Sequence, residues 1–271
     1  MNVFKFEFRR LLKAAIIWGI ACGLLIIMFM SFYPSMKDSG LQELISTKLD
    51  AFPPAMMEAF NISGAVDFSK IADYTAYVIQ YIAMAAGVYG AILGVSALVK
   101  EESEGTIEFL YSKPITRSKI VTAKLLSSAA IFMVFMIIVG SITMGVSIIV
   151  KPEDVEIMTL IVDVKTILIG MAFLGYIFMA VGFLISVLLK NGKQAISISL
   201  GIFFTTYVLG VIGKLKESLK GFLYLSPFEY VAPANIIKDG FDMKFVLLGL
   251  GIIAISIVMT YVIYNKKDLA I

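Results

Sequence analysis

The chain has 271 residues, of which 59% are hydrophobic and only 16% are charged, and its formal net charge is +3. Soluble domains average about 45–50% apolar and about 25% charged residues, so this composition excludes an ordinary water-soluble enzyme and favours a protein embedded in lipid. The sequence has no histidine and one cysteine, which excludes a histidine-based catalytic triad, a histidine metal site and a disulfide within the chain.

Six uncharged apolar stretches are each close to or above the roughly 20 residues that cross about 30 Å of hydrocarbon. Continuous runs of this kind indicate helices, because barrel strands would show short alternating segments. We therefore predict an all-α integral membrane protein with a single transmembrane domain over residues 1–271. The six transmembrane helices are expected at about residues 14–33, 74–99, 125–150, 166–189, 195–213 and 245–264.

The segment before the first stretch, residues 4–13, mixes phenylalanines with lysines and arginines. As a helix it would lie in the headgroup region, with its basic side chains at the anionic membrane surface. We predict a short amphipathic interfacial helix here. The alternative is a plain basic flank of the first span.

The distribution of basic residues predicts the orientation. With the N-terminus inside, the inner segments hold 13 lysines and arginines and the outer segments hold 10. All three arginines, Arg9, Arg10 and Arg117, then fall on the inner side. Because basic residues concentrate in cytoplasmic loops, we predict that both termini are cytoplasmic.

The second stretch carries small residues at a spacing of three and four, which places them on one helix face: Ala83, Gly87, Gly90, Gly94 and Ala97. Small residues let helix backbones approach closely in membranes. Three interpretations of this stripe remain open, namely packing within the subunit, an interface between subunits and a transport path.

The longest inner connection, residues 100–124, begins with acidic residues and continues into a short helix-compatible stretch. Pro114 ends this stretch because proline cannot continue a helix and disfavours helical geometry before it. We predict a short helix that stands off the membrane between spans two and three. Its acidic residues suit a basic partner and its apolar residues suit a groove, whereas the alternative is an ordinary solvated loop.

The last outer connection contains an apolar and aromatic stretch, residues 225–237, that is interrupted by Pro227 and Pro233. Such a segment can dip into the outer membrane surface as a re-entrant piece. Backbone at that depth needs shelter by protein or by a water-filled cavity.

The six predicted spans contain no ionisable residue, although ion-driven carriers and channels usually place such groups at mid-membrane. The phosphate-binding pattern of nucleotide hydrolases is also missing. Its nearest match is Gly213-Lys214, but Leu215 stands where serine or threonine is required and Val208 replaces the first glycine. We therefore expect that the energy for any uphill transport comes from a partner.

The inner loop carries a recognisable pattern. Glu101-x-x-Glu104-Gly105-Thr106-x-Glu108-x-Leu110 followed by Pro114-x-x-Arg117 resembles the cytoplasmic loop of the permease subunits of ABC-2-type exporters. The outer segment 226–240 and the ending over residues 264–269 are similar to that family as well. The resemblance implies that the loop holds a coupling helix that docks on a separate ATPase subunit, through Glu101, Glu104, Gly105, Thr106, Ile107, Glu108, Leu110, Tyr111, Pro114 and Arg117.

The same resemblance implies the composition of the working unit. Two ATP-binding subunits and a second permease chain, identical or different, would assemble in the plasma membrane, in contact with lipid and without nucleic acid. This multi-pass chain would not be an enzyme and would hold no cofactor, because ATP and Mg²⁺ would bind to the partner. The glutamates would face basic residues of the partner, Gly105 would permit a tight turn, and Pro114 with Arg117 would fix the re-entry into the membrane.

Two other functions remain as alternatives to an exporter permease. The first is a carrier or channel that works alone, and the second is a membrane scaffold or sensor subunit that transports nothing. The substrate is not encoded in any motif. Uncharged apolar spans suit an amphipathic drug, a lipid-like molecule or a peptide better than a small ion.

Overall fold

The computed structural model describes residues 3–38, 53, 57, 67–103, 105, 115–189 and 191–267, and all regular structure in these ranges is helical. Six of the described helices are long and apolar enough to cross a membrane, which confirms the predicted number. They are α1 (Val3–Met30), α5 (Ile71–Ser103), α7 (Arg117–Ile149), α8 (Ile157–Leu188), α9 (Ala195–Leu215) and α12 (Met243–Lys266). The shorter elements are α2 (Tyr33–Asp38), η1 (Gly192–Gln194), η2 (Glu217–Leu225), α10 (Pro227–Tyr230) and α11 (Pro233–Asp239).

Most of the long helices extend well beyond the predicted spans. Helices α5 and α7 each have 33 residues, which corresponds to about 50 Å of helix against about 30 Å of hydrocarbon. Helix α8 begins at Ile157 and includes Asp163 and Lys165, which precede the predicted start at residue 166. The predicted spans were ended at charged residues. The helices continue past these residues, because a charged side chain does not interrupt the backbone hydrogen bonds of a helix.

The N-terminal segment is helical as predicted, but it does not form a short helix of its own, and its position in the headgroup region stays a prediction. Helix α1 runs without a break from Val3 to Met30, so the basic and aromatic residues form its first turns. No proline or glycine interrupts the chain before Gly19, and Glu7 is buried against the rest of the bundle. This burial holds the first turns in line with the rest of α1.

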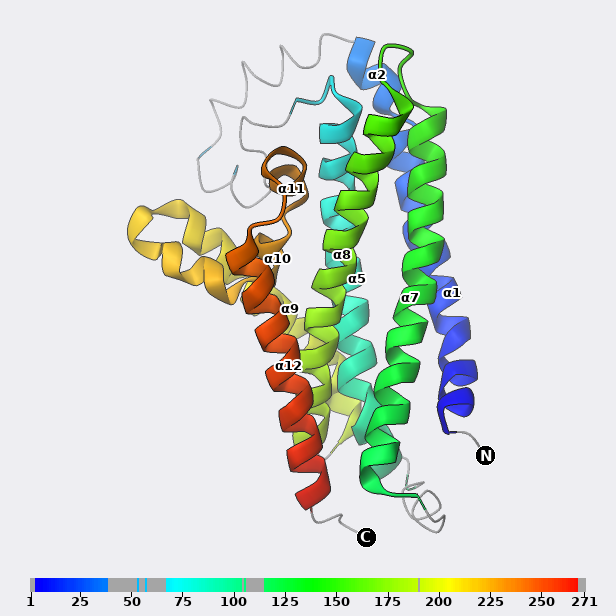
Figure 1. Ribbon diagram of the computed structural model, residues 1–271, viewed down its shortest axis with the longest axis vertical. Coiled ribbons are helices and arrows are strands. Elements are labelled where there is room, and N and C mark those ends of the chain that lie inside the picture. The colour runs from blue at the N-terminus through cyan, green and yellow to red at the C-terminus, as the bar shows by residue number, and fades with distance from the viewer. Residues whose placement is uncertain are drawn as a thin grey trace.

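The helices are arranged around a central pair (Figure 1). Helices α5 and α8 share the most extensive contact in the molecule, and α1 and α7 form the second largest contact. Helix α12 packs mainly on α8, and α9 packs on α5. The bundle is therefore built from two tightly packed pairs, α5–α8 and α1–α7, with α9 and α12 added to the first.

The small-residue stripe explains the closeness of α5 and α8. A Cβ atom added to Gly94 would lie 2.9 Å from the Cα of Gly182, and one added to Gly90 would overlap the carbonyl group of Gly175. A Cβ on Gly87 would lie 3.1 Å from the ring of Phe178, which also belongs to α8. Of the three interpretations of the stripe, packing within the chain is the one seen at these glycines.

The two ends of the bundle differ. Both chain ends, the end of α5 and the start of α7 lie at one end, which we call the terminal end (Figure 1). Helices α2 and α11 lie toward the opposite end. An even number of crossings places both termini on one side of a membrane, and the assignment of that side to the cytoplasm remains a prediction.

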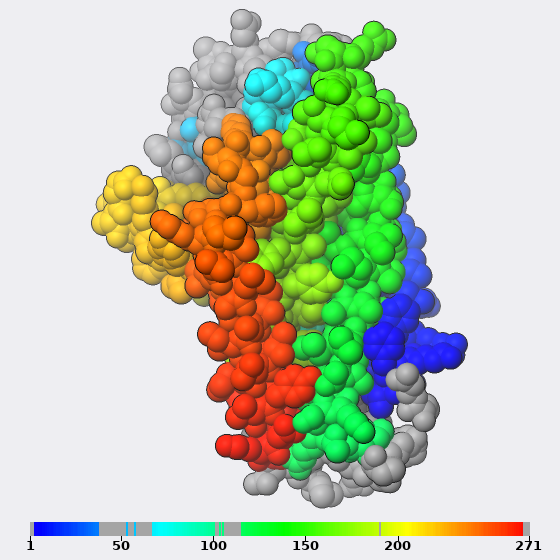
Figure 2. Space-filling model, in the orientation of Figure 1, coloured from blue at the N-terminus to red at the C-terminus, as the bar shows by residue number. Residues whose placement is uncertain are grey.

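The predicted re-entrant segment forms the two short helices α10 and α11, which begin with Pro227 and Pro233 at positions where a proline fits a helix start. Gly240 ends α11 with a φ of 75°, as glycines do after a helix. Helix α11 contacts α5 and α8, and Tyr230, the last residue of α10, is 1% exposed, so protein shelters this segment. Next to it, the end of α9 and η2 stand out from the side of the bundle (Figure 2).

Candidate functional site

The residues predicted to couple to an ATPase lie between the end of α5 and the start of α7. Glu101 is in the last turn of α5, Gly105 is exposed with a φ of 67°, and Arg117 is the first residue of α7. The other predicted residues lie outside the described residues: Glu104, Thr106, Ile107, Glu108, Leu110, Tyr111 and Pro114. The coupling helix therefore stays a prediction, while both helices that flank it are described.

Arg117 anchors the start of α7 to the end of α12. Its Nη1 donates to the backbone oxygens of Tyr264, Asn265 and Lys267, at 3.4, 3.3 and 2.6 Å respectively. The last carbonyls of a helix lack hydrogen-bond donors within the helix and carry the negative end of its dipole. A guanidinium group supplies both the donors and a positive charge. The sequence predicted a role for Arg117 in the return of the chain to the membrane, but this contact with α12 was not foreseen.

Further polar contacts join the same helix ends. The amide of Asn265 donates to Ser118 Oγ at 3.1 Å, and the hydroxyls of Thr122 and Tyr261 lie 2.7 Å apart. Lys267 Nζ donates to the backbone oxygen of Leu189, directly after α8, at 3.4 Å. Helices α7, α8 and α12 are thus joined by side-chain hydrogen bonds at the terminal end.

A buried ionic group at the terminal end was missed by sequence reasoning. Lys124 of α7 is 2% exposed and its Nζ lies 3.0 Å from Glu7 Oε1 of α1, while Glu7 Oε2 lies 2.7 Å from Arg10 Nη2. Lys124 Nζ also donates to the backbone oxygen of Ala97 in α5, at 2.7 Å. Buried charges are retained only when they are paired and hydrogen-bonded, and Lys124 meets both conditions while it connects three helices.

The sequence contains a pattern that indicates the buried position of Lys124. Lys124 follows Val121 by three residues and precedes Ser128 by four, so it stands on the helix face that carries the buried residues of α7. The prediction assigned Lys124 to a water-facing loop because a lysine ends an uncharged run. A helical stripe that continued across Lys124 would have placed it inside the bundle.

An apolar cavity of about 670 Å³ lies in the half of the bundle away from the chain ends. It opens between the helix pairs, with α1 and α2 on one side and the start of α5 on the other. The hydroxyl groups of Tyr77 and Tyr81 are 3.1 Å apart and belong to its few polar groups. Its walls are formed by Leu25, Phe29, Met36, Phe68, Tyr74, Tyr77, Val78, Tyr81, Ile82 and Ala85.

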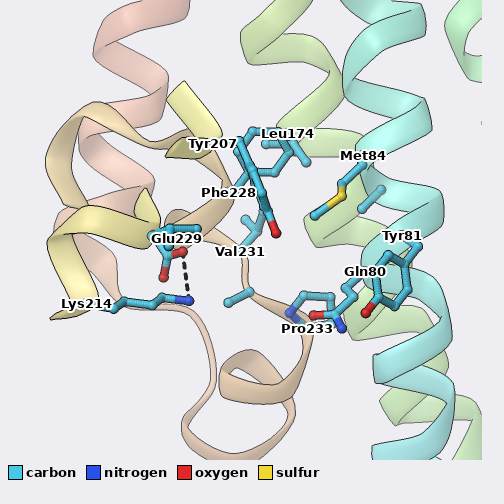
Figure 3. A pocket seen from close by; sticks show the side chains of 13 residues that line it. Gln80, Tyr81, Met84, Leu174, Tyr207, Lys214, Phe228, Glu229, Val231 and Pro233 are labelled. Atoms are coloured by element: carbon cyan, nitrogen blue, oxygen red, sulfur yellow. Dashed lines mark ion pairs between the residues drawn. The ribbon is translucent and has the colours of Figure 1, made fainter. Parts of the chain in front are cut away.

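A second, much smaller pocket of about 40 Å³ lies between α5, α9 and the α10–α11 segment (Figure 3). Tyr81 lines both this pocket and the apolar cavity. Lys214 at the end of α9 and Glu229 of α10 form an ion pair at 2.9 Å on its wall, with side chains 18% and 13% exposed. Because the two charges neutralise each other, the pair fastens α10 to α9 and leaves no net charge in the pocket.

The sites described above consist of apolar cavity walls and of polar contacts that hold helices together. Among the described residues, no three cysteine, aspartate or glutamate side chains are grouped so that they could hold a metal ion. The larger cavity has apolar walls with tyrosine hydroxyls, which suits the apolar part of a solute. The buried Glu7–Lys124 pair and the contacts of Arg117 with the end of α12 lie at the terminal end, beside the predicted coupling segment.

The comparison with protein families agrees with this arrangement. The family model described as ABC-2 family transporter protein matches residues 1–269, which include all six long helices. A search of curated proteins gives no match. The match over nearly the whole chain, together with six apolar helices, shows that this chain belongs to the ABC-2 family of transporter proteins and is a multi-pass permease of the cell membrane.

Proposed function

We propose that this chain is the transmembrane permease subunit of an ATP-driven exporter, in which a separate ATPase subunit supplies the energy. The membership of the ABC-2 family is the observation that carries the proposal. Two ATPase subunits and a second permease chain, identical or different, complete the unit. ATP and Mg²⁺ bind to the ATPase, since the sequence of this chain lacks the phosphate-binding pattern.

The coupling segment transmits the motion of the ATPase to the bundle. Glu101, Glu104 and Glu108 meet basic residues of the ATPase, and the positive φ of Gly105 supports the tight turn assigned to it. The segment leads from α5, which is locked to α8, into α7, which is packed on α1. A displacement of the segment therefore acts on both helix pairs at once.

The apolar cavity between the helix pairs receives the solute in this proposal. Its volume of about 670 Å³ lies within the range of about 300–1,000 Å³ found for small-molecule sites. Apolar walls with a few hydroxyl groups suit an amphipathic solute. A change in the separation of α1 and α5 would change the access to this cavity.

The experiment compares Gly105→Arg with Gly240→Arg. Both glycines are exposed, both have a positive φ, and a Cβ on either meets no atom of the described residues within 4 Å. Both variants place a side chain at a positive φ and so carry backbone strain of about 1–3 kcal/mol, and only the first lies at the predicted docking surface. We expect that Gly105→Arg loses co-purification with the ATPase encoded beside it and that Gly240→Arg retains it.

Equal binding of the ATPase by both variants, and by a Glu101→Ala, Glu104→Ala, Glu108→Ala triple variant, would contradict the proposed docking surface.

Liposomes that contain the purified chain alone test the first alternative, because a carrier or channel that works alone would move an amphipathic dye without ATP. The second alternative predicts that the chain binds its partner while its removal leaves solute flux unchanged.

A further inference from the structure

The last part of α5 shares its backbone hydrogen bonds with α8. The N–H groups of Leu98 and Val99 both donate to Ser186 Oγ, at 2.9 and 3.0 Å. All three residues are almost fully buried. Helix α5 is continuous through these residues. Each N–H of a regular α-helix donates to the carbonyl four residues earlier, so Ser186 Oγ enters this ladder as an added acceptor for two successive N–H groups.

The glycine contact makes this entry possible. A Cβ on Gly182 would lie 2.8 Å from the backbone oxygen of Ala91, and one on Gly94 would lie 2.9 Å from the Cα of Gly182. Ser186 is one helical turn beyond Gly182, on the same face of α8. Its short side chain therefore reaches the backbone of α5 at the next turn toward the terminal end.

Ala97, the residue before Leu98, is hydrogen-bonded to α7 and not to α8. The backbone oxygen of Ala97 accepts from Lys124 Nζ of α7, and the same ammonium group is paired with Glu7 of α1. Three successive residues of α5 thus bond to three other helices directly or through Lys124. A side chain that inserts into the hydrogen-bond ladder is one of the recognised causes of helix bending.

We propose that residues 97–99 of α5 form a hinge, and that Ser186 and Lys124 are the positioning residues that set its angle. This inference rests on the proposed function, because the hinge lies directly before the predicted coupling segment. In this arrangement the last turn of α5 moves with the ATPase. The hydroxyl of Ser186 and the ammonium of Lys124 supply partners for the hinge backbone, so the bend can change without leaving polar groups unpaired in an apolar interior.

The hinge connects the coupling segment to the cavity. Because α5 is fastened to α8 at Ser186 and to α1 through Lys124 and Glu7, a change of its angle moves α1 relative to the α5–α8 pair. Because α1 and α5 lie on opposite sides of the apolar cavity, this movement changes the distance across it. The hinge therefore converts a displacement at the terminal end into a change of cavity width in the other half of the bundle.

The experiment measures the cavity width directly in the full chain, assembled with its ATPase in nanodiscs. In a Cys22→Ala background, spin labels at Leu25→Cys of α1 and Tyr81→Cys of α5 report the distance across the cavity, with and without ATP and vanadate. We expect a shift of about 2–5 Å in the otherwise unchanged chain. With Ser186→Ala the shift is expected to fall by about threefold or more, while ATPase binding and ATP hydrolysis remain.

A matched control is Ser147→Ala in α7, which removes a fully buried serine hydroxyl that has no hydrogen-bond partner among the described residues. It should keep the full shift. Lys124→Met should lose the shift and Lys124→Arg should retain most of it, because arginine keeps both the charge and the donor. An equal shift in Ser186→Ala and Ser147→Ala, or no shift in the unchanged chain while it binds the ATPase and supports hydrolysis, would overturn the hinge. A chain that binds no ATPase would instead overturn the proposed function, and the hinge's role with it.

Discussion

Gly94 of α5 and Gly182 of α8 are in backbone contact, since a Cβ atom on Gly94 would lie only 2.9 Å from the Cα of Gly182. Contacts of this kind cannot be relieved by a rotamer change, because backbone atoms face each other. Between membrane helices, where water gives no hydrophobic driving force, such close packing is a main source of association energy. At the level of these two glycines, α5 and α8 are therefore packed backbone to backbone.

The first prediction is that Gly94→Ala destabilises the protein. The added methyl group would force α5 and α8 apart, at a cost of about 1–3 kcal/mol for overpacking, which exceeds the gain in helix propensity of about 1 kcal/mol at most sites. A fall in the apparent Tm in detergent, measured by the loss of the monodisperse peak after heating, would show it. Gly251→Ala in α12 is the control, because a Cβ there meets no atom within 4 Å and only the propensity gain remains.

The second prediction concerns two buried tyrosines of α5. The hydroxyl of Tyr89 is buried and has no hydrogen-bond partner in the part of the chain that the structure describes, whereas the hydroxyl of Tyr74 donates to the backbone oxygen of Phe29 at 2.7 Å. Tyr89→Phe should raise the Tm, since a buried unpaired polar group costs about 1–3 kcal/mol. Tyr74→Phe should lower the Tm, because it leaves the carbonyl of Phe29 without this donor. Shifts of the same sign in both variants would contradict this reasoning.

The third prediction is that Arg117→Lys loosens the end of α12. The guanidinium reaches three backbone oxygens through one nitrogen, and a lysine ammonium presents a single point charge without the planar fork. Amide hydrogen exchange over the last turn of α12 should become about tenfold faster, which corresponds to the roughly 1.4 kcal/mol expected from weakening hydrogen bonds to a charged group. Arg9→Lys is the control, as Arg9 is exposed on α1. Unchanged exchange in Arg117→Lys would show that the contact does not hold α12.

The fourth prediction is that Lys124→Met costs about 3 kcal/mol of stability, because it leaves a buried carboxylate with one partner fewer. The loss is expected at the low end of the range for broken buried pairs, since Arg10 still contacts Glu7. The double variant Glu7→Met, Lys124→Met should recover part of it. Lys220→Met breaks the exposed pair with Glu217 and should change the Tm little, as surface pairs contribute about 0–1 kcal/mol.

The helices could be predicted from the sequence because each is defined by a local feature, an uncharged apolar run. An uncharged run of about 20 residues has one stable form in lipid, so the number of helices long and apolar enough to cross a membrane was predicted correctly. The spacing of Gly87, Gly90 and Gly94 marked a close contact, but the partner face with Gly175 and Gly182 lies on another helix. A period of three and four identifies a face of a helix and does not identify what packs against it.

The candidate site was less predictable, since its contacts join residues far apart in the chain. Lys124 and Glu7 are separated by 117 positions and Arg117 and Lys267 by 150. Charged residues at the ends of apolar runs are usually solvated, so local reasoning placed Lys124 in water. Its burial follows from three-helix packing at the terminal end, where Glu7 and the carbonyl of Ala97 compensate its charge.

The chain has one tryptophan, Trp18 of α1, and its ring stacks on Tyr89 of α5 at a centroid distance of 5.4 Å. The contact joins a helix of one tightly packed pair to a helix of the other. Its indole emission can therefore report any sliding or parting of the two pairs, in unlabelled protein and in real time. Natural fluorescence thus offers a stopped-flow signal for the transport cycle that needs neither an introduced dye nor a known solute.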